Sequence, residues 1–301
     1  MSTSSFHRHG RVVLGLLVIL VRLNEPLRSQ EKTPEETFQF LPGTMLFVPI
    51  TASWQEPRLG VRLELGSTRL KLDLGGALEF LEYRSPGSTP VRMRAAVEFF
   101  AYGLTTSANG LRLQVDALDG YFGGYVAARV PCGSNTLDFR LRIMHLSSHF
   151  VDGHLGGDFE SIDGRVPTPY TRDFGELVIT PSFLLGPSEI HVYGGVSYST
   201  LARPEDLARW GGLAGVEVWS AGLFGTVFGR PFSVYCAVHT QLEGIPQYSL
   251  TTNVEAGFKF GQRTSSGIRC YAEFFSGNNI FHQYYDQYTQ YWGVGIAFDV
   301  R

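Results

Sequence analysis

Two residues near the middle of the chain could carry out ester chemistry. His145 and Ser147 lie two positions apart in the stretch TLDFRLRIMHLSSHF, which runs from Thr136 to Phe150. A serine hydroxyl becomes a nucleophile when a neighbouring imidazole takes its proton, and that imidazole needs a third group, such as a carboxylate, to orient it. The first requirement is therefore that the two side chains share one face.

The pattern around them predicts a β-strand on which they do. Alternate residues project to the same side of a strand, and the parity of His145 and Ser147 is that of four apolar residues: Leu137, Phe139, Leu141 and Ile143.

The acid would come from the next strand, where the outward parity includes Asp173. If the hairpin closes symmetrically about residue 160, Asp173 falls opposite Ser147. Glu176 is the alternative acid, although its parity is inward unless a β-bulge intervenes. The predicted site is thus Ser147 as nucleophile, His145 as base and Asp173 as orienting acid.

The loop after His149 could bind a divalent cation, because hard cations take carboxylate oxygens. Its candidate ligands are Asp152, His154, Asp158, Glu160 and Asp163. Their spacing matches no EF-hand, and an acidic loop that is simply solvated is the alternative. No other cofactor is predicted.

The element that positions these residues is one of about twelve predicted strands. A two-residue period recurs from about residue 58 onward, with apolar residues on one face and polar or glycine residues on the other. The segments are residues 57–65, 69–82, 91–103, 119–130, 136–149, 173–185, 189–200, 211–222, 231–242, 248–260, 267–276 and 288–300.

The connections between these segments alternate in length. Residues 131–135 and 186–188 are short joins, whereas 150–172 and 277–287 are long ones. Short turns at one end and long loops at the other are typical of bacterial outer-membrane barrels. A soluble β-sandwich or lipocalin-like barrel also alternates apolar and polar residues along its strands, so this alternation alone does not decide the class. Strand number, strand length and loop asymmetry together favour an all-β, closed antiparallel transmembrane barrel.

The polar faces carry charges of both signs, which favours a lumen filled by paired charges over an open pore. Aromatic residues near the last loop are interpreted as a girdle at the membrane interface. They are Tyr284, Tyr285, Tyr288, Tyr291 and Trp292.

The N-terminus resembles an export signal. Basic residues precede a ten-residue apolar run, VVLGLLVILV from Val12 to Val21, which is too short to cross a bilayer as a helix. We predict a signal peptide over 1–30, a periplasmic segment over 31–56 and the outer-membrane barrel over 57–301.

Composition excludes several other classes. A net charge of -3 gives no basic surface for nucleic acid, and three cysteines form neither a disulfide framework nor a metal pair.

Three longer stretches resemble a bacterial family of uncharacterised outer-membrane proteins, the domain of unknown function family 1207. They are FLPGTMLFVPITASWQEPRLGVRLEL from Phe40, HLSSHFVDG from His145 and the closing YYDQYTQYWGVGIAFDV. The resemblance implies an exported barrel and no activity. It departs at the end of the chain, because outer-membrane barrels commonly end in an aromatic residue and this one ends in Val300 and Arg301.

The pair His145 and Ser147 also resembles the H-x-S motif of the outer-membrane phospholipase A and lipid A deacylase barrels. Their motif continues with Asn and a small residue, where this chain has Ser148 and His149.

These observations leave three functional hypotheses. The first is a non-enzymatic outer-membrane barrel with a charge-filled lumen, the second a lipid esterase and the third a narrow solute channel. The expected partners are outer-membrane lipids and the barrel-insertion machinery.

Overall fold

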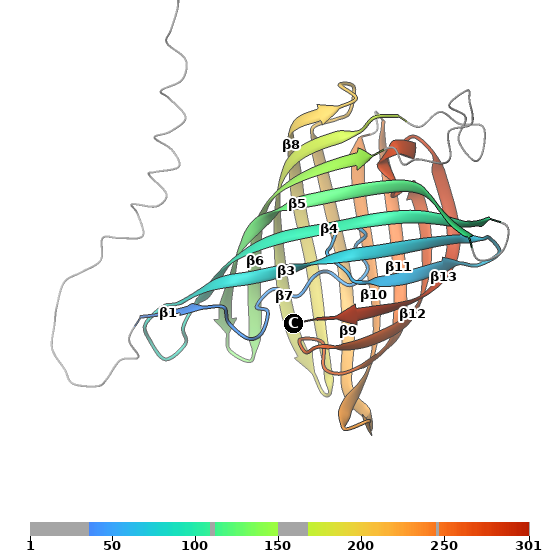
Figure 1. The fold of residues 1–301 in the computed structure, drawn as a ribbon. Helices are drawn as coiled ribbons and strands as arrows, with labels where there is room; N and C mark the ends of the chain where they lie inside the picture. Colours follow the sequence, from blue (N-terminus) through green and yellow to red (C-terminus); the bar gives the residue numbers. More distant parts are fainter. Residues whose placement is uncertain (1–35, 109–111, 150–167, 245–246, 301) are drawn as a thin grey trace, which may run out of the picture. The chain divides into compact units, whose positions relative to one another are not determined.

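The described part of the chain is a closed antiparallel β-barrel of twelve strands (Figure 1). The computed structural model describes residues 36–108, 112–149, 168–244 and 247–300. Strands β2 to β13 pair in sequence order, and the ring closes where β13 pairs with β2. They are β2 (Gly60–Glu64), β3 (Arg69–Arg84), β4 (Arg92–Ala108), β5 (Arg112–Cys132), β6 (Asn135–His149), β7 (Thr171–Leu185), β8 (Ser188–Arg203), β9 (Trp210–Val227), β10 (Arg230–Gly244), β11 (Tyr248–Phe260), β12 (Gly267–Asn278) and β13 (Tyr288–Asp299). The predicted all-β architecture, a closed antiparallel barrel of about twelve strands, is confirmed.

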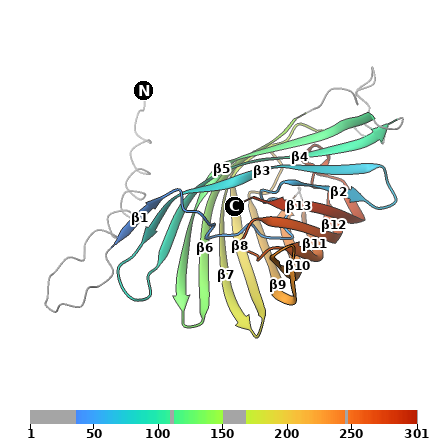
Figure 2. The ribbon, with the colours of Figure 1, turned by 60° about the horizontal axis from the view of Figure 1, so that its bottom comes forward.

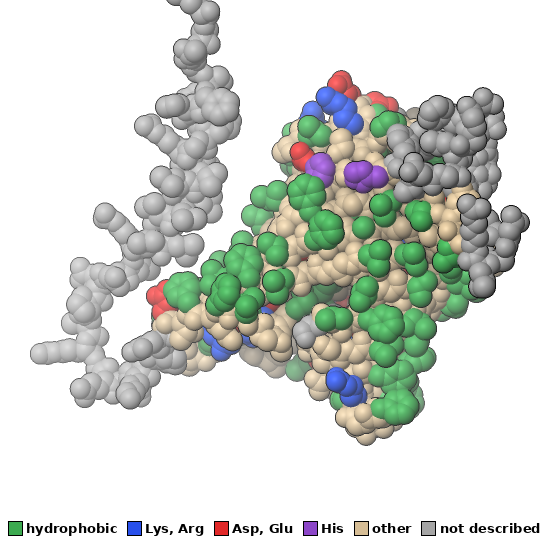
Figure 3. All heavy atoms as spheres, viewed as in Figure 1, with side chains coloured by type: hydrophobic (Ala, Val, Ile, Leu, Met, Phe, Trp, Pro, Cys, Tyr) green, Lys and Arg blue, Asp and Glu red, His purple; other side chains and the backbone are tan. Residues whose placement is uncertain are grey.

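The two faces of the wall differ as the two-residue period predicts. On β6, Leu141 and Ile143 are 55% and 70% exposed on the outside, whereas Arg140 and Arg142 are buried inside the barrel. Apolar side chains spread over the outer wall, and the charged side chains visible in this view lie toward its ends (Figure 3). The interior is therefore polar and the exterior apolar.

The first strand of the wall is interrupted. A short strand, β1 (Thr37–Phe40), pairs with β3 at Leu81–Arg84, and β2 pairs with the same strand at Leu70–Asp73. Between the partners Leu81 and Asp73, β3 advances by eight residues. The segment that pairs with it advances by twenty residues over the same distance, from Phe40 at the end of β1 to Gly60 at the start of β2. The excess of twelve residues leaves the wall between β1 and β2.

The segment between these two pairings forms a plug, which we define as residues 42–58, inside the ring of strands (Figure 2). Leu46, Phe47, Ile50, Trp54 and Glu56 of the plug are all buried. The sequence predicts a periplasmic segment over residues 31–56, ahead of the barrel. The structure places residues 46–56 in the lumen. Residues 1–35, including the predicted signal peptide, lie outside the described part of the chain.

The loop between β12 and β13 covers the lumen at the end of the barrel where the long loops lie. We call residues 279–287 the cap; it contains the 3-10 helix η1 (His282–Tyr284). Ile280, Phe281 and Tyr284 of the cap pack in one buried cluster with Trp54 of the plug and inward-facing aromatic residues of the wall, including Phe100. Tyr284 and Tyr291 are thus buried, and Tyr291 stacks on Phe275 inside the barrel, so these two do not belong to the predicted outer girdle.

No described helix is long and apolar enough to cross a membrane.

Candidate functional site

The predicted ester-cleaving residues lie on the outer wall, at the loop end of β6 and β7. The parity that exposes Leu141 and Ile143 continues through His145, Ser147 and His149, while Met144 and Leu146 between them are buried inside. The side chain of His145 is 31% exposed and that of Asp173, on β7, is 45% exposed. A substrate would therefore reach this cluster from outside the barrel, not through its lumen.

His145 and Asp173 are directly paired. Their Nδ1 and Oδ1 atoms lie 2.5 Å apart, and the two residues face each other in the antiparallel register. The imidazole also packs against the ring of Phe122 on β5, with ring centroids 4.7 Å apart. A carboxylate on Nδ1 orients an imidazole and leaves Nε2 as the nitrogen that would meet a substrate.

The register differs from the predicted one by two residues. Asp173 faces His145, and Thr171 is the residue that faces Ser147. The difference arises because the predicted pairing requires a hairpin that closes symmetrically about residue 160, and the observed register does not have this symmetry. The observed register nevertheless pairs His145, the predicted base, with Asp173, the predicted acid.

Ser147 contacts a different histidine. Its Oγ lies 2.9 Å from Nε2 of His149, the last residue of β6. The cluster is therefore divided into an imidazole–carboxylate pair, His145 with Asp173, and a hydroxyl–imidazole pair, Ser147 with His149. Either histidine could serve as base: His149 is already in contact with the hydroxyl, and His145 would need Ser147 to rotate toward it.

The alternative acid has another role. Glu176 points inward, as its parity predicts, and accepts a hydrogen bond from Arg140 at 3.0 Å. It is therefore part of the lumen and not of the outer wall.

The predicted cation ligands cannot be placed. Asp152, His154, Asp158, Glu160 and Asp163 all lie in residues 150–167, outside the described part of the chain. Within the described residues, no group of three or more His, Cys, Asp or Glu side chains could hold a metal ion.

Sequence reasoning missed the plug, which is bound by the inward-facing charges of the wall. Glu56 accepts hydrogen bonds from Arg140 at 2.8 and 2.5 Å. Arg142 donates to the backbone oxygen of Gln55 at 2.9 Å, and the backbone N–H of Thr51 donates to Glu217 at 2.6 Å. The wall charges are thus paired largely with the plug and with one another.

The cap is held in a similar way. Asp119, a fully buried residue of β5, accepts hydrogen bonds from the backbone N–H of His282 at 2.9 Å and from Ser148 Oγ at 2.5 Å. Its carboxylate also lies 2.8 Å from Nδ1 of His282.

The plug had one signal in the sequence: MLFVPI, from Met45, is an apolar run that follows no strand period. The contacts of the cap had no such local signal.

Comparison with known proteins identifies the family. No curated protein matches the chain. The model of a family described as protein of unknown function (DUF1207) matches residues 116–300, which extend from β5 to β13 and include His145, Ser147 and Asp173. The chain belongs to this family of proteins of unknown function, DUF1207.

Proposed function

We propose that the protein is an integral barrel of the bacterial outer membrane with a sealed lumen and a structural role. The observation that carries this proposal is the inverted distribution of its side chains. Arg140, Arg142 and Lys259 are among the largest fully buried side chains, while Phe99 and Ile143 are 69% and 70% exposed. Water-soluble proteins almost never bury such charges in preference to large apolar residues, whereas a barrel in lipid requires this arrangement.

Aromatic side chains on the outer wall support the same proposal. One group lies near the loop end of the strands: Tyr198, Trp210, Tyr248, Tyr288 and Trp292. A second group lies near the turn end: Phe224, Phe228, Phe232, Phe258 and Phe260. Aromatic girdles at both interfaces are a feature of outer-membrane barrels.

The filled lumen argues against a channel. The plug fills the interior toward the turn end and the cap covers the loop end. Among the described residues, one cavity beside the plug and one between the plug and the cap measure about 10 Å³ each, roughly enough for a single water.

The test is expression of the full chain with its N-terminal segment in a bacterial host. We expect it in the outer-membrane fraction, with an electrophoretic mobility that shifts on heating and no step conductance in planar bilayers. A native pool in the soluble fraction would contradict the membrane location, and conductance would contradict the sealed lumen.

The paired His145 and Asp173 favour a second candidate function, a lipid esterase on the outer wall. The pair faces outward, where acyl esters of membrane lipids would be accessible, and Ser147 lies two residues along the same face. In a refolded barrel given phospholipid, Ser147→Ala should abolish the release of fatty acid. Ser276→Ala is the matched control, because Ser276 is a partly exposed residue near the loop end of β12. Equal activity of both variants and the wild type would exclude Ser147 as nucleophile.

A further inference from the structure

The barrel wall has a seam where the first strand is interrupted. Strand β2 pairs with β3 only as far as Asp73. The pairing of β1 with β3 ends at Leu41, whose backbone N–H donates to the backbone oxygen of Phe80 at 2.9 Å. Residues 74–79 of β3 therefore have β4 on one side and, among the described residues, no paired strand on the other. The C-terminal end of β13 borders the same gap.

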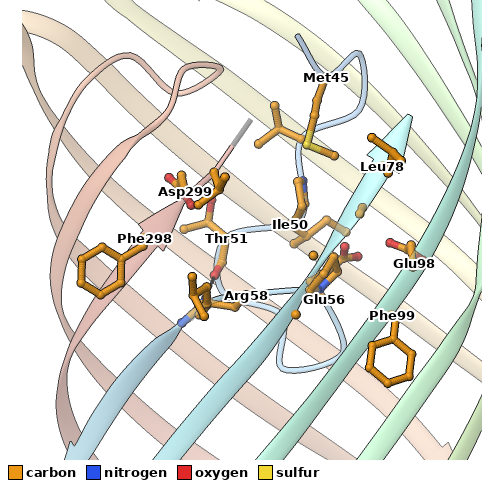
Figure 4. Close-up of a pocket in the computed structure, with 18 of the residues that line it drawn as sticks. Met45, Ile50, Thr51, Glu56, Arg58, Leu78, Glu98, Phe99, Phe298 and Asp299 are labelled. Carbon is orange, nitrogen blue, oxygen red and sulfur yellow. Dashed lines mark hydrogen bonds between the residues drawn. The ribbon is translucent and has the colours of Figure 1, made fainter. Parts of the chain in front are cut away.

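A pocket of about 530 Å³ lies at this seam (Figure 4). Its volume is in the range of about 300–1,000 Å³ that is typical of small-molecule sites. Leu78, Phe99 and Phe298 line it from the wall, and Val48 and Ile50 line it from the plug. The pocket thus connects the exposed apolar surface with side chains that are buried inside the barrel.

The wall leaves this space because its residues on β3 are small. Gly75, Gly76 and Ala77 of β3 all line the pocket, and Gly75 and Ala77 share the inward parity of the strand. Ala77 lines the pocket directly. A large side chain at position 77 would enter the pocket.

The charged groups that line the pocket are mostly paired with others. Arg58 donates to Glu255 at 2.9 Å, and Arg269 donates to the same carboxylate at 3.1 Å. Glu56 is bound by Arg140 at 2.8 Å. Little of this charge is left to recognise an ionic ligand, and the accessible surface is dominated by apolar side chains.

We propose that the seam pocket holds one acyl chain of a membrane phospholipid, which enters sideways from the bilayer. This inference rests on the proposed membrane location. The mouth of the pocket is formed by Leu78 and Phe99, which are 54% and 69% exposed on the same apolar wall that would face lipid. A chain that enters past Leu78, Phe99 and Phe298 would contact Val48 and Ile50 of the plug in the same pocket, beside lining charges such as Glu56 and Arg58 that are paired with other residues of the barrel. An apolar chain is therefore favoured over a polar or charged ligand.

The test uses the full-length barrel in vesicles of phosphatidylethanolamine and phosphatidylglycerol with a small share of phospholipid that carries a diazirine near the end of one acyl chain. After irradiation, labelled residues are located by mass spectrometry. Val48 and Ile50 are each only 5% exposed, so bulk lipid cannot reach them, whereas Ile143 on the far part of the wall reports contact with bulk lipid. We expect label on the plug as well as on Ile143.

The outcomes separate the two proposals. Label on Ile143 with none on the plug would overturn the seam site and leave the membrane barrel intact. No label on either would overturn the membrane location and the seam site together. A protein fragment that co-purifies with the seam and excludes the label would also overturn the lipid proposal, in favour of a strand paired to β3.

A pair of variants sharpens the result. Ala77→Trp should abolish label on the plug while label on Ile143 stays as in the wild type. Leu74→Trp is the control, because Leu74 is exposed on the outer face of the same strand and does not line the pocket. Undiminished plug label in a folded Ala77→Trp barrel would contradict the proposal. If that variant does not fold, the labelling pattern of the wild type still decides it.

Discussion

His145 and Asp173 face each other across β6 and β7 with Nδ1 and Oδ1 2.5 Å apart, while the neighbouring Ser147 contacts His149. The acid therefore orients an imidazole that does not yet touch the hydroxyl. If this outer wall cleaves esters, the next question is which of the two histidines serves as the base.

Asp173→Asn addresses that question. If His145 is the base, loss of the carboxylate lets the imidazole adopt the wrong tautomer, and the rate of ester cleavage should fall by about 10⁴-fold, as in a serine protease triad. Fatty-acid release measures it. His149→Asn should then have a smaller effect; the reverse ranking would assign the base to His149.

The ion pairs between plug and wall should dominate stability. Glu56→Gln weakens the buried contact with Arg140, and breaking a buried ion pair costs about 3–5 kcal/mol because a charge is left uncompensated. A urea titration of the refolded barrel in detergent should show a clear fall in the free energy of unfolding.

The control for this measurement is Glu205→Gln. Glu205 pairs with Arg203 at 3.2 Å, but their side chains are 78% and 56% exposed, so the change should cost no more than about 1 kcal/mol. Equal effects of the two substitutions would mean that the plug does not sit in a dry interior.

The strands of the wall could be predicted from the sequence far better than the plug that fills the lumen. Strand β11 is observed at Tyr248–Phe260, as predicted, because its period of two is complete and is set by residues adjacent in the chain. The plug contacts join residues that are far apart, such as Thr51 with Glu217 and Ala52 with Asn253, and no local pattern encodes them.

The candidate site shows the same division. The outward parity of His145, Ser147 and Asp173 follows from strand periodicity and is observed. Which residue faces which depends on how the hairpin closes, and we placed Asp173 two residues from its true partner. The aromatic girdle was misassigned at Tyr291 because its parity is inward, which the alternating residues of β13 already indicated.

The cap should open when its acceptor on the wall is removed. Asp119→Ala deprives the backbone N–H of His282 and the hydroxyl of Ser148 of their partner. The backbone N–H of His282 is buried, and an unpaired buried group costs about 1–3 kcal/mol, so hydrogen exchange of amides in residues 279–287 should accelerate. Amides in the turn at 261–266 serve as the internal control. Unchanged exchange in the cap would show that its apolar contacts alone hold it.

Conductance should require the removal of both closures. Deletion of residues 45–56 removes the twelve-residue excess and lets β1 and β2 continue as one strand, but the cap still covers the loop end. We expect no step conductance after this deletion or after replacement of residues 280–285 by a short glycine–serine linker, and measurable conductance when the two changes are combined. Conductance from the intact protein in planar bilayers would refute the sealed lumen.

The most direct test of the account uses cysteines that the chain already contains. Cys236 is exposed in the middle of β10 on the apolar wall, whereas Cys132 is exposed at the turn end of β5. In vesicles with both aqueous sides accessible, a charged, membrane-impermeant maleimide should modify Cys132 and spare Cys236, and unfolding in urea after the lipid is dissolved should make both react. Modification of Cys236 as fast as Cys132 in intact vesicles would contradict the claim that this wall faces lipid.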